Sequence, residues 1–197
     1  MWWKLFAFKV VLLNPINQNQ FEKELILMKT NKIIITSLFL SIGLILHQIT
    51  PGIFFGIKPD FLLVFMILSI LLTRSFKITL ITGIAAGVLC ALTTTFPFGQ
   101  IPNIIDKIIT SIIIYGAYKS INSNSLIKLT AIYFVGTIVS GSIFLGSALL
   151  LSGLPAPFLI LFLSVVLPTS VINSFIGLAL HKLIATNPAI KSKFINY

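Results

Sequence analysis

Residues 129–153 read LTAIYFVGTIVSGSIFLGSALLLSG, which is 25 consecutive positions without a charged side chain. About 20 apolar residues in a row allow an α-helix to cross the hydrocarbon core of a bilayer. The stretch therefore predicts a transmembrane helix. Its small residues recur at a spacing of four, as in Gly136 and Ser140, and such pairs let helices approach closely in lipid.

The composition of the whole chain agrees with this interpretation. Of its 197 residues, 57% are hydrophobic and only 9% are charged, whereas a soluble domain carries about 25% charged residues. This excludes a soluble enzyme, a disordered protein and a nucleic-acid-binding protein. The net charge of +10 does not indicate nucleic acid as a partner, because the basic residues stand at the ends of apolar runs and not in one patch. We expect a multi-pass protein of the cell membrane, surrounded by lipid.

Six apolar runs predict an all-α membrane protein in which one domain, residues 28–197, crosses the bilayer six times. The predicted spans are residues 33–50, 59–73, 78–95, 104–118, 129–153 and 158–181. The second and fourth are short for a bilayer. Small residues in the third span, Gly83 and Gly87, form a GxxxG pair that is expected to pack inside the bundle or against a partner subunit.

The distribution of positive charge predicts the orientation of these spans, because cytoplasmic loops carry an excess of Lys and Arg. With the N-terminus inside, the cytoplasmic segments contain nine basic residues, and Lys58 and Lys107 lie outside. The nine are Lys29, Lys32, Arg74, Lys77, Lys119, Lys128, Lys182, Lys191 and Lys193. This asymmetry predicts that both ends of the chain lie in the cytoplasm.

The three predicted outer connections are rich in proline. They contain six of the nine prolines in the chain: Pro51, Pro59, Pro97, Pro102, Pro155 and Pro157. Proline fixes φ and removes a backbone donor, so these connections are expected to be stiff. Irregular backbone near the membrane is tolerated where protein buries it or water reaches it. We therefore expect a recessed binding site on the outer side.

Residues 1–27 stand apart as an N-terminal extension. The apolar run from Leu5 to Leu13 is interrupted by Lys9 and is too short to span a bilayer. It is either an amphipathic segment lying in the membrane interface or a stretch upstream of the true start of translation at Met28. We favour the start at Met28, which directly precedes Lys29 and the first span.

Two carboxylates, Asp60 and Asp106, fall in the membrane region, and each has a Lys close in sequence, Lys58 and Lys107. An ionisable group at membrane depth is costly and is by default a functional candidate. Opposite charges suit a zwitterion such as an amino acid. The alternative is that these residues mark the membrane interface at helix N-termini, where Asp also favours the helix dipole.

The segment 93–103, which reads TTTFPFGQIPN, adds candidate contacts for a flat polar solute. Phe96 and Phe98 are suited to stack on a ring, and the amides of Gln100 and Asn103 both donate and accept hydrogen bonds. In the last span, the amide of Asn173 needs a hydrogen-bond partner, which is either a polar group on another helix or a ligand. The alternative for the whole segment is an ordinary outer turn.

Motifs of enzymes are missing from the sequence. It contains no HExxH, no Walker lysine in a Gly-rich loop and no GxSxG. Cys90 is the single cysteine, which excludes a CxxC site. We predict no enzymatic activity, no catalytic residue, no cofactor and no metal site.

Three stretches carry a family resemblance. They are GIKPD at residues 56–60, ALTTTFPFGQIPNIIDK at 91–107 and GTIVSGSIFL at 136–145. With Pro168 and Asn173 in the last span, they resemble the bacterial tryptophan transport protein family over residues 28–185. The most specific part is Gly99 to Lys107.

The resemblance implies uptake of L-tryptophan across the cytoplasmic membrane. The family is similar to the substrate-binding membrane subunits of energy-coupling-factor vitamin transporters, which have six helices, an outward-facing site and separate coupling and ATPase subunits. The energy source would be ATP hydrolysed by such partners or an ion gradient.

For bound tryptophan, Lys58 is the candidate for the carboxylate, and Asp60 or Asp106 for the ammonium. The ring would lie against Phe96, Phe98 or Phe54, oriented by the amides of Gln100, Asn103 and Asn173. Two alternatives stay open at this point: uptake of another small aromatic solute or vitamin, and a non-transporting membrane scaffold whose outer loops enclose no ligand-sized cavity.

Overall fold

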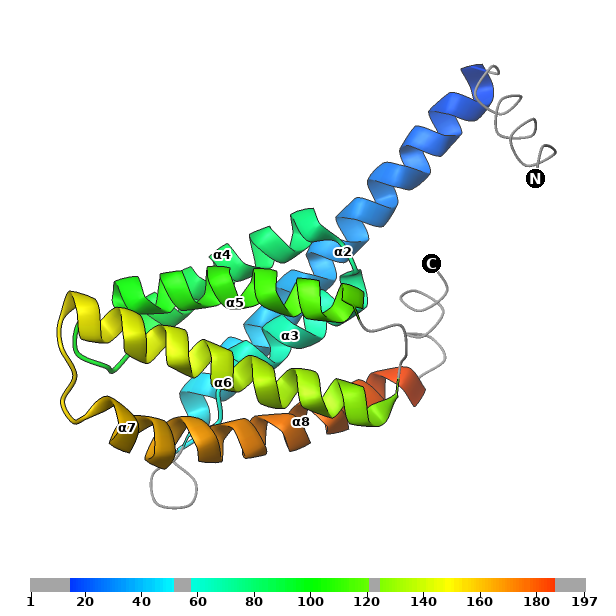
Figure 1. Cartoon of the computed structure of the whole chain (residues 1–197). Helices are drawn as coiled ribbons and strands as arrows, with labels where there is room; N and C mark the ends of the chain where they lie inside the picture. Colours follow the sequence, from blue (N-terminus) through cyan, green and yellow to red (C-terminus); the bar gives the residue numbers. More distant parts are fainter. Residues whose placement is uncertain (1–14, 52–57, 121–124, 187–197) are drawn as a thin grey trace. The chain divides into compact units, whose positions relative to one another are not determined.

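The computed structural model describes residues 15–51, 58–120 and 125–186, and these residues contain helices and no strand. The all-α prediction is confirmed for this part of the chain. The helices are α2 (Pro15–Ile49), α3 (Phe61–Thr73), α4 (Phe76–Thr93), α5 (Gln100–Ser120), α6 (Leu126–Leu151), α7 (Phe158–Leu161), the π-helix η1 (Phe162–Val166) and α8 (Leu167–Thr186), shown in Figure 1.

The chain forms two compact units, residues 1–35 and residues 36–197. The described part of the first unit is the beginning of α2, which runs through Met28. The apolar run from Leu5 to Leu13 lies outside the described residues. The second unit holds the remainder of α2 and all the other helices, and the account below concerns this unit.

Four helical stretches among the described residues are long and apolar enough to cross a membrane. They are Thr30–Ile49, Phe76–Thr93, Leu126–Leu151 and Phe158–Ile184. The other two predicted spans differ from them for identifiable reasons. Helix α3 has only 13 residues, or about 20 Å at 1.5 Å per residue, and α5 carries the charged pair Asp106 and Lys107 in its interior.

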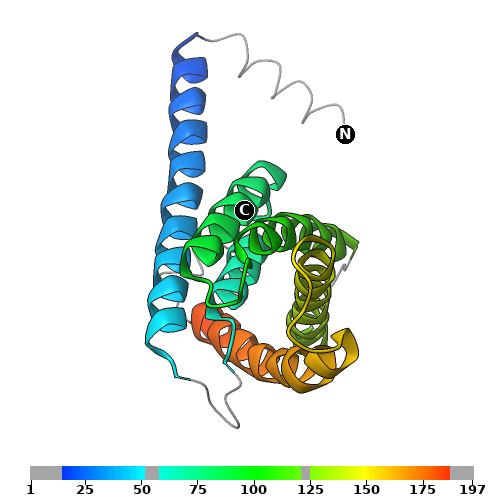
Figure 2. The ribbon, with the colours of Figure 1, turned by 90° about the vertical axis from the view of Figure 1, so that its left-hand side faces the viewer.

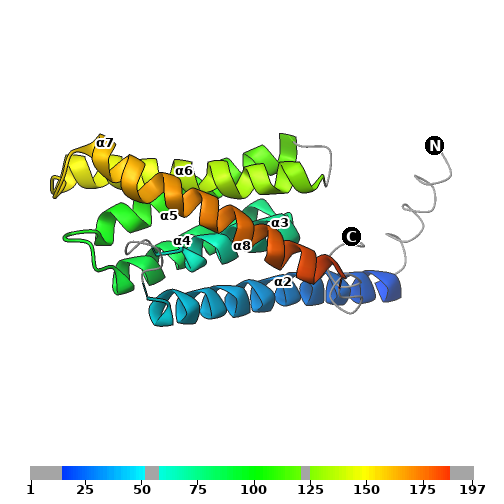
Figure 3. The same ribbon diagram turned by 90° about the horizontal axis from the view of Figure 1, so that it is seen from below.

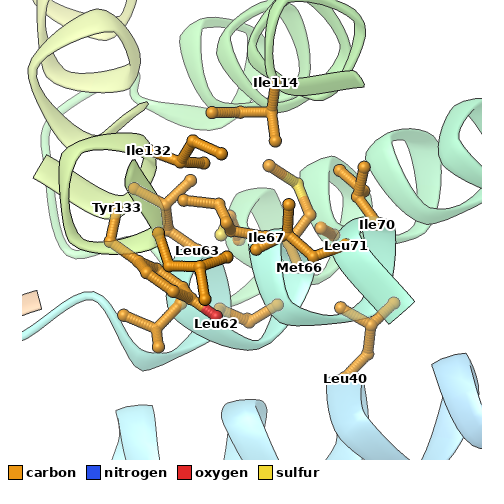
Figure 4. Close-up of a cluster of buried hydrophobic side chains, with 14 residues drawn as sticks. Leu40, Leu62, Leu63, Met66, Ile67, Ile70, Leu71, Ile114, Ile132 and Tyr133 are labelled. Carbon is orange, nitrogen blue, oxygen red and sulfur yellow. The ribbon is translucent and has the colours of Figure 1, made fainter. Parts of the chain in front are cut away.

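Helix α3 forms the centre of the second unit. Every residue from Leu62 to Thr73 is buried, which explains why its sequence is apolar on all faces. Figure 4 shows Leu63, Met66 and Ile67 of α3 packed among Ile114 of α5, Ile132 and Tyr133 of α6, and Leu40 of α2. The short length of α3 is therefore consistent with a helix that protein surrounds, since it does not have to match the bilayer on its own.

The other helices follow one another around the bundle. Helix α4 packs on α5, α5 on α6 and α6 on α8, while α3 contacts α4, α5, α6 and α8 (Figure 2). Two glycines of α4 permit the first of these contacts. A Cβ atom at Gly87 would lie 3.0 Å from the Cα atom of Ile104, and one at Gly83 would lie 3.1 Å from the carbonyl oxygen of Lys107. The GxxxG pair therefore packs inside the bundle, as one of its two predicted uses requires.

The connections predicted to share one side of the membrane lie at one end of the second unit. Figures 1 and 3 show the end of α2, the start of α3, residues 94–99 and residues 152–157 at this end. We call it the proline-rich end. At the opposite end, Arg74 takes a left-handed conformation (φ 52°), and its N–H donates to the carbonyl of Ile70. This tight turn leads directly into α4.

Candidate functional site

A cavity of about 440 Å³ lies in the second unit, and its lining includes residues of the connections at the proline-rich end, such as Lys58, Thr94 and Thr95. This volume lies within the range of pockets that bind small molecules. Helices α2 to α8 all contribute to its lining. The lining residues are His47, Gln48, Lys58, Asp60, Leu63, Cys90, Thr93, Thr94, Thr95, Phe96, Asn103, Asp106, Lys107, Thr137, Ser140, Gly141, Phe144, Leu145, Leu161, Val165, Val166 and Thr169.

Three charged side chains meet in this cavity. The Nζ atom of Lys107 donates to Asp106 Oδ2 at 2.8 Å, to Asp60 Oδ2 at 2.9 Å and to the hydroxyl of Ser140 at 3.1 Å. An ammonium has three donors, and here each of them has an oxygen partner. We call Asp60, Asp106 and Lys107 the charged trio. It joins the start of α3 to α5, and Ser140 ties it to α6.

The two carboxylates of the trio differ in their surroundings. The Asp106 side chain is only 1% exposed, and it also accepts hydrogen bonds from Thr110 at 2.9 Å and from Ser140 at 2.8 Å. The Asp60 side chain is 24% exposed and caps α3 by accepting from the backbone N–H of Leu63 at 2.9 Å. Asp60 is therefore the carboxylate of the trio that a ligand in the cavity can reach.

The ion-pair partner of Asp60 is distant in the sequence. Lys58 is the near neighbour of Asp60 along the chain, but the partner is Lys107, 47 positions away. Lys58 lines the cavity, and no ion pair joins it to any described residue. The physical reason is that α3 and α5 pack together, which brings the end of a long Lys side chain to the cap of α3.

The buried amide of Asn173 links three helices. Its Oδ1 atom accepts from the backbone N–H of Asp60 at 3.1 Å, and its Nδ2 atom donates to the Thr137 hydroxyl at 3.3 Å. One of the two alternatives for Asn173, a hydrogen bond between helices, is thus present. The amide lies behind the cavity lining and holds Asp60 in place.

The connection between α4 and α5 separates the candidate residues of segment 93–103. Phe96 and Asn103 line the cavity, but Phe98 and Gln100 do not. The N–H of Gly99 donates to the carbonyl of Phe96 at 3.0 Å, and Phe98 takes a left-handed conformation (φ 54°) that leaves it 76% exposed. The tight turn therefore points Phe98 out of the site.

An apolar wall completes the cavity. The ring of Phe96 packs edge-to-face on that of Phe144, with centroids 5.1 Å apart, and Leu145, Leu161, Val165 and Val166 continue the wall. Of the predicted residues, Lys58, Asp60, Phe96, Asn103 and Asp106 line the cavity. The other wall residues, together with Lys107, His47 and Thr169, were not among the predicted site residues, and Phe54, also predicted as a ring contact, lies outside the described residues. Apolar residues in a span carry no local signal that separates a cavity wall from a lipid-facing surface.

Comparison with known proteins places the chain in a family. Residues 29–187 match the family model described as Tryptophan transporter TrpP. The chain belongs to the TrpP family. No solved structure matches it.

Curated relatives of this TrpP family member carry the name "Probable tryptophan transport protein". One from Clostridium acetobutylicum is 49% identical over 76% of this chain and 89% of its own length. One from Clostridium perfringens is 40% identical, over 79% of this chain and 91% of its own length. One from Bacillus subtilis is 42% identical, over 81% of this chain and 93% of its own length. Family and helices together identify a membrane protein of tryptophan transport.

Proposed function

We propose that this TrpP family member is a six-span transporter of the cell membrane that takes up L-tryptophan, and that the cavity at the proline-rich end is its binding site. The observation that carries the proposal is the cavity itself, which has a charged cluster and an aromatic, apolar wall. A zwitterion with a large ring needs both. Capture from outside follows if this end faces the exterior, as the distribution of basic residues predicts.

The charges favour an amino acid as the ligand. The charged trio contains two carboxylates and one ammonium, which leaves an excess negative charge for the ammonium group of a ligand. Asp60, the accessible member, is our candidate for this contact, and Asp106 holds Lys107. Lys58, which has no ion pair among the described residues, is the candidate for the ligand carboxylate.

The indole ring would occupy the apolar part of the cavity. Phe96 and Phe144 already pack edge-to-face, and a third aromatic ring extends such a cluster favourably. Asn103 also lines the cavity and is available to orient the ligand. Its Nδ2 atom donates to the carbonyl of Gly99 at 2.8 Å, which leaves its second N–H and its side-chain oxygen, without a partner among the described residues, for a ligand to use.

A non-transporting scaffold is less compatible with these observations. A scaffold of this kind predicts that the outer loops enclose no ligand-sized cavity. It also predicts that the segment from Gly99 to Asp106 turns toward lipid. Asn103 and Asp106 of this segment instead line the cavity. Uptake of another aromatic solute would use the same features, so competition decides between the ligands.

The direct test is uptake of labelled L-tryptophan by cells that lack their own tryptophan transport and express the full chain. We expect saturable uptake that unlabelled tryptophan abolishes, and that a hundredfold excess of other aromatic amino acids or of vitamins with flat rings reduces much less. Absence of uptake, together with absence of tryptophan binding to the purified protein, would refute the proposal. Stronger competition by a vitamin would redirect it to that solute.

The energy source follows from the resemblance to energy-coupling-factor subunits. We infer that partner subunits, a coupling protein and ATPases, drive release to the cytoplasm. Uptake should then require co-expression of these partners and survive dissipation of ion gradients by an ionophore. Uptake by the chain alone in vesicles, driven by an imposed ion gradient, would show the opposite.

A further inference from the structure

Thr169 has a buried hydroxyl group without a partner. It lies in α8 and lines the cavity, and its residue is 7% exposed. Its Oγ1 atom has no hydrogen-bond partner among the described residues. Buried polar groups in proteins are nearly always paired, so an unpaired one requires an explanation.

Several other hydroxyls in these helices donate to a carbonyl of their own helix. Thr82 donates to the carbonyl of Ile78 and Thr137 to that of Tyr133, each four residues earlier. For Thr169 the corresponding carbonyl belongs to Val165, which lies in η1. There the hydrogen bonds run over five residues, as from the N–H of Leu167 to the carbonyl of Phe162. Thr169 makes no such bond, so its hydroxyl is buried, without a partner among the described residues, in a residue that lines the cavity.

The position of Thr169 suits the ring of an amino-acid ligand, at the end away from its ammonium and carboxylate groups. It precedes Asn173 by four residues, which is about 6 Å along a helix, and Asn173 holds the backbone of Asp60 at 3.1 Å. The helix residues that line the cavity just before it, Leu161, Val165 and Val166, are apolar. The hydroxyl of Thr169 therefore follows a run of apolar lining residues in the same helical stretch, roughly one helical turn from the residue that positions the charged trio.

We propose that Thr169 is a specificity-determining residue whose Oγ1 atom accepts a hydrogen bond from the ring N–H of bound tryptophan. The inference rests on the proposed function. An indole has one polar atom in an otherwise apolar ring, and Thr169 offers an unpaired hydroxyl next to the apolar lining residues Val165 and Val166. A site built to bond a ligand N–H disfavours analogues that lack it, because the protein group is then left buried and unpaired.

The test compares two ligands on the purified full-length protein: tryptophan, and 3-benzothienylalanine, in which sulfur replaces the ring N–H. The wild-type protein should bind tryptophan about tenfold more tightly than the analogue. Thr169→Val should weaken tryptophan binding by about the same factor and leave binding of the analogue within about twofold. Thr169→Ser, which keeps the hydroxyl, should retain the preference.

Thr130→Val is the matched control. Thr130 donates to the carbonyl of Leu126 in its own helix and is outside the cavity lining, so both affinities should stay unchanged. If Thr169→Val keeps the preference for tryptophan, or weakens both ligands equally, the role of Thr169 is refuted while the proposed function stands. If the wild-type protein binds neither ligand, the proposed function fails, and this inference fails with it.

Discussion

At the scale of single residues, the charged trio is the cluster whose disruption should cost the protein considerable folding stability. Breaking a buried ion pair by removing one partner typically costs about 3–5 kcal/mol, because the remaining charge stays buried. Lys107 is the only cation in hydrogen-bond contact with Asp60 and Asp106 among the described residues. Its removal would leave two carboxylates close together with no Lys or Arg partner among the described residues.

We therefore expect Lys107→Met to lower the stability of the protein in detergent by about 3–5 kcal/mol. Thermal unfolding of the purified protein measures this effect. Lys58→Met is the matched control, since Lys58 lines the same cavity but has no ion pair with the described residues. It should lower tryptophan uptake and leave stability within about 0.5 kcal/mol. Equal stability of the two variants would contradict the central role of Lys107.

Asp60 allows its charge to be tested separately from its structural role. Asn caps helices about as well as Asp, so Asp60→Asn should keep the bond to the N–H of Leu63. It takes one carboxylate partner from Lys107 but leaves Asp106 in place, so the loss of stability should be smaller than for Lys107→Met. Asp60→Asn also removes the negative charge assigned to the ligand ammonium, and tryptophan affinity should fall at least about tenfold. Binding to the purified protein and its thermal unfolding give the two readouts. Unchanged affinity would contradict the contact between Asp60 and the ligand.

At the scale of elements, the close approach of α4 and α5 positions the charged residues of α5. A Cβ atom at Gly87 would meet the backbone of Ile104, whereas one at Gly116, in α5, would meet nothing within 4 Å. Gly87→Ala should therefore push the two helices apart and destabilise the protein by about 1–3 kcal/mol.

Gly116→Ala is the control for this substitution. It should be neutral or stabilising by up to about 1 kcal/mol, because Ala is the better helix former. Thermal unfolding of both variants, together with tryptophan binding, checks the expectation. If Gly87→Ala were as stable as Gly116→Ala, the inference that α4 and α5 approach too closely at Gly87 to admit a Cβ atom would be contradicted.

At the scale of the whole molecule, the orientation in the membrane follows from the distribution of Lys and Arg. Cys90 is the single cysteine in the chain, so a Cys90→Ser background makes introduced cysteines unambiguous. Ser152 lies at the proline-rich end and Ser120 at the end of α5, and both are exposed. In intact cells, a membrane-impermeant maleimide should label Ser152→Cys, whereas Ser120→Cys should react only after permeabilisation. The reverse pattern would place the cavity on the cytoplasmic side.

Much of the architecture could be read from local sequence. Long apolar runs predicted helices, because backbone N–H and C=O groups in lipid must all be hydrogen-bonded within the protein. Gly83 and Gly87 predicted a close helix contact that the structure contains. The order of the apolar runs predicted which connections share one end of the bundle, and those connections are the proline-rich ones. The family was recognisable from the segment between Gly99 and Lys107. These features depend on neighbours in the chain and need no knowledge of the fold.

Other features were decided by tertiary structure alone. Which Lys neutralises Asp60 depends on how α5 packs beside α3, and the choice of Lys107 over Lys58 has no local signal. The outward turn of Phe98, the complete burial of α3 and the unpaired hydroxyl of Thr169 likewise depend on which helices are neighbours and on how each is rotated. The partners of a buried polar group come from distant parts of the sequence, so hydropathy and spacing predict that such a group needs partners, and only the packed bundle supplies them.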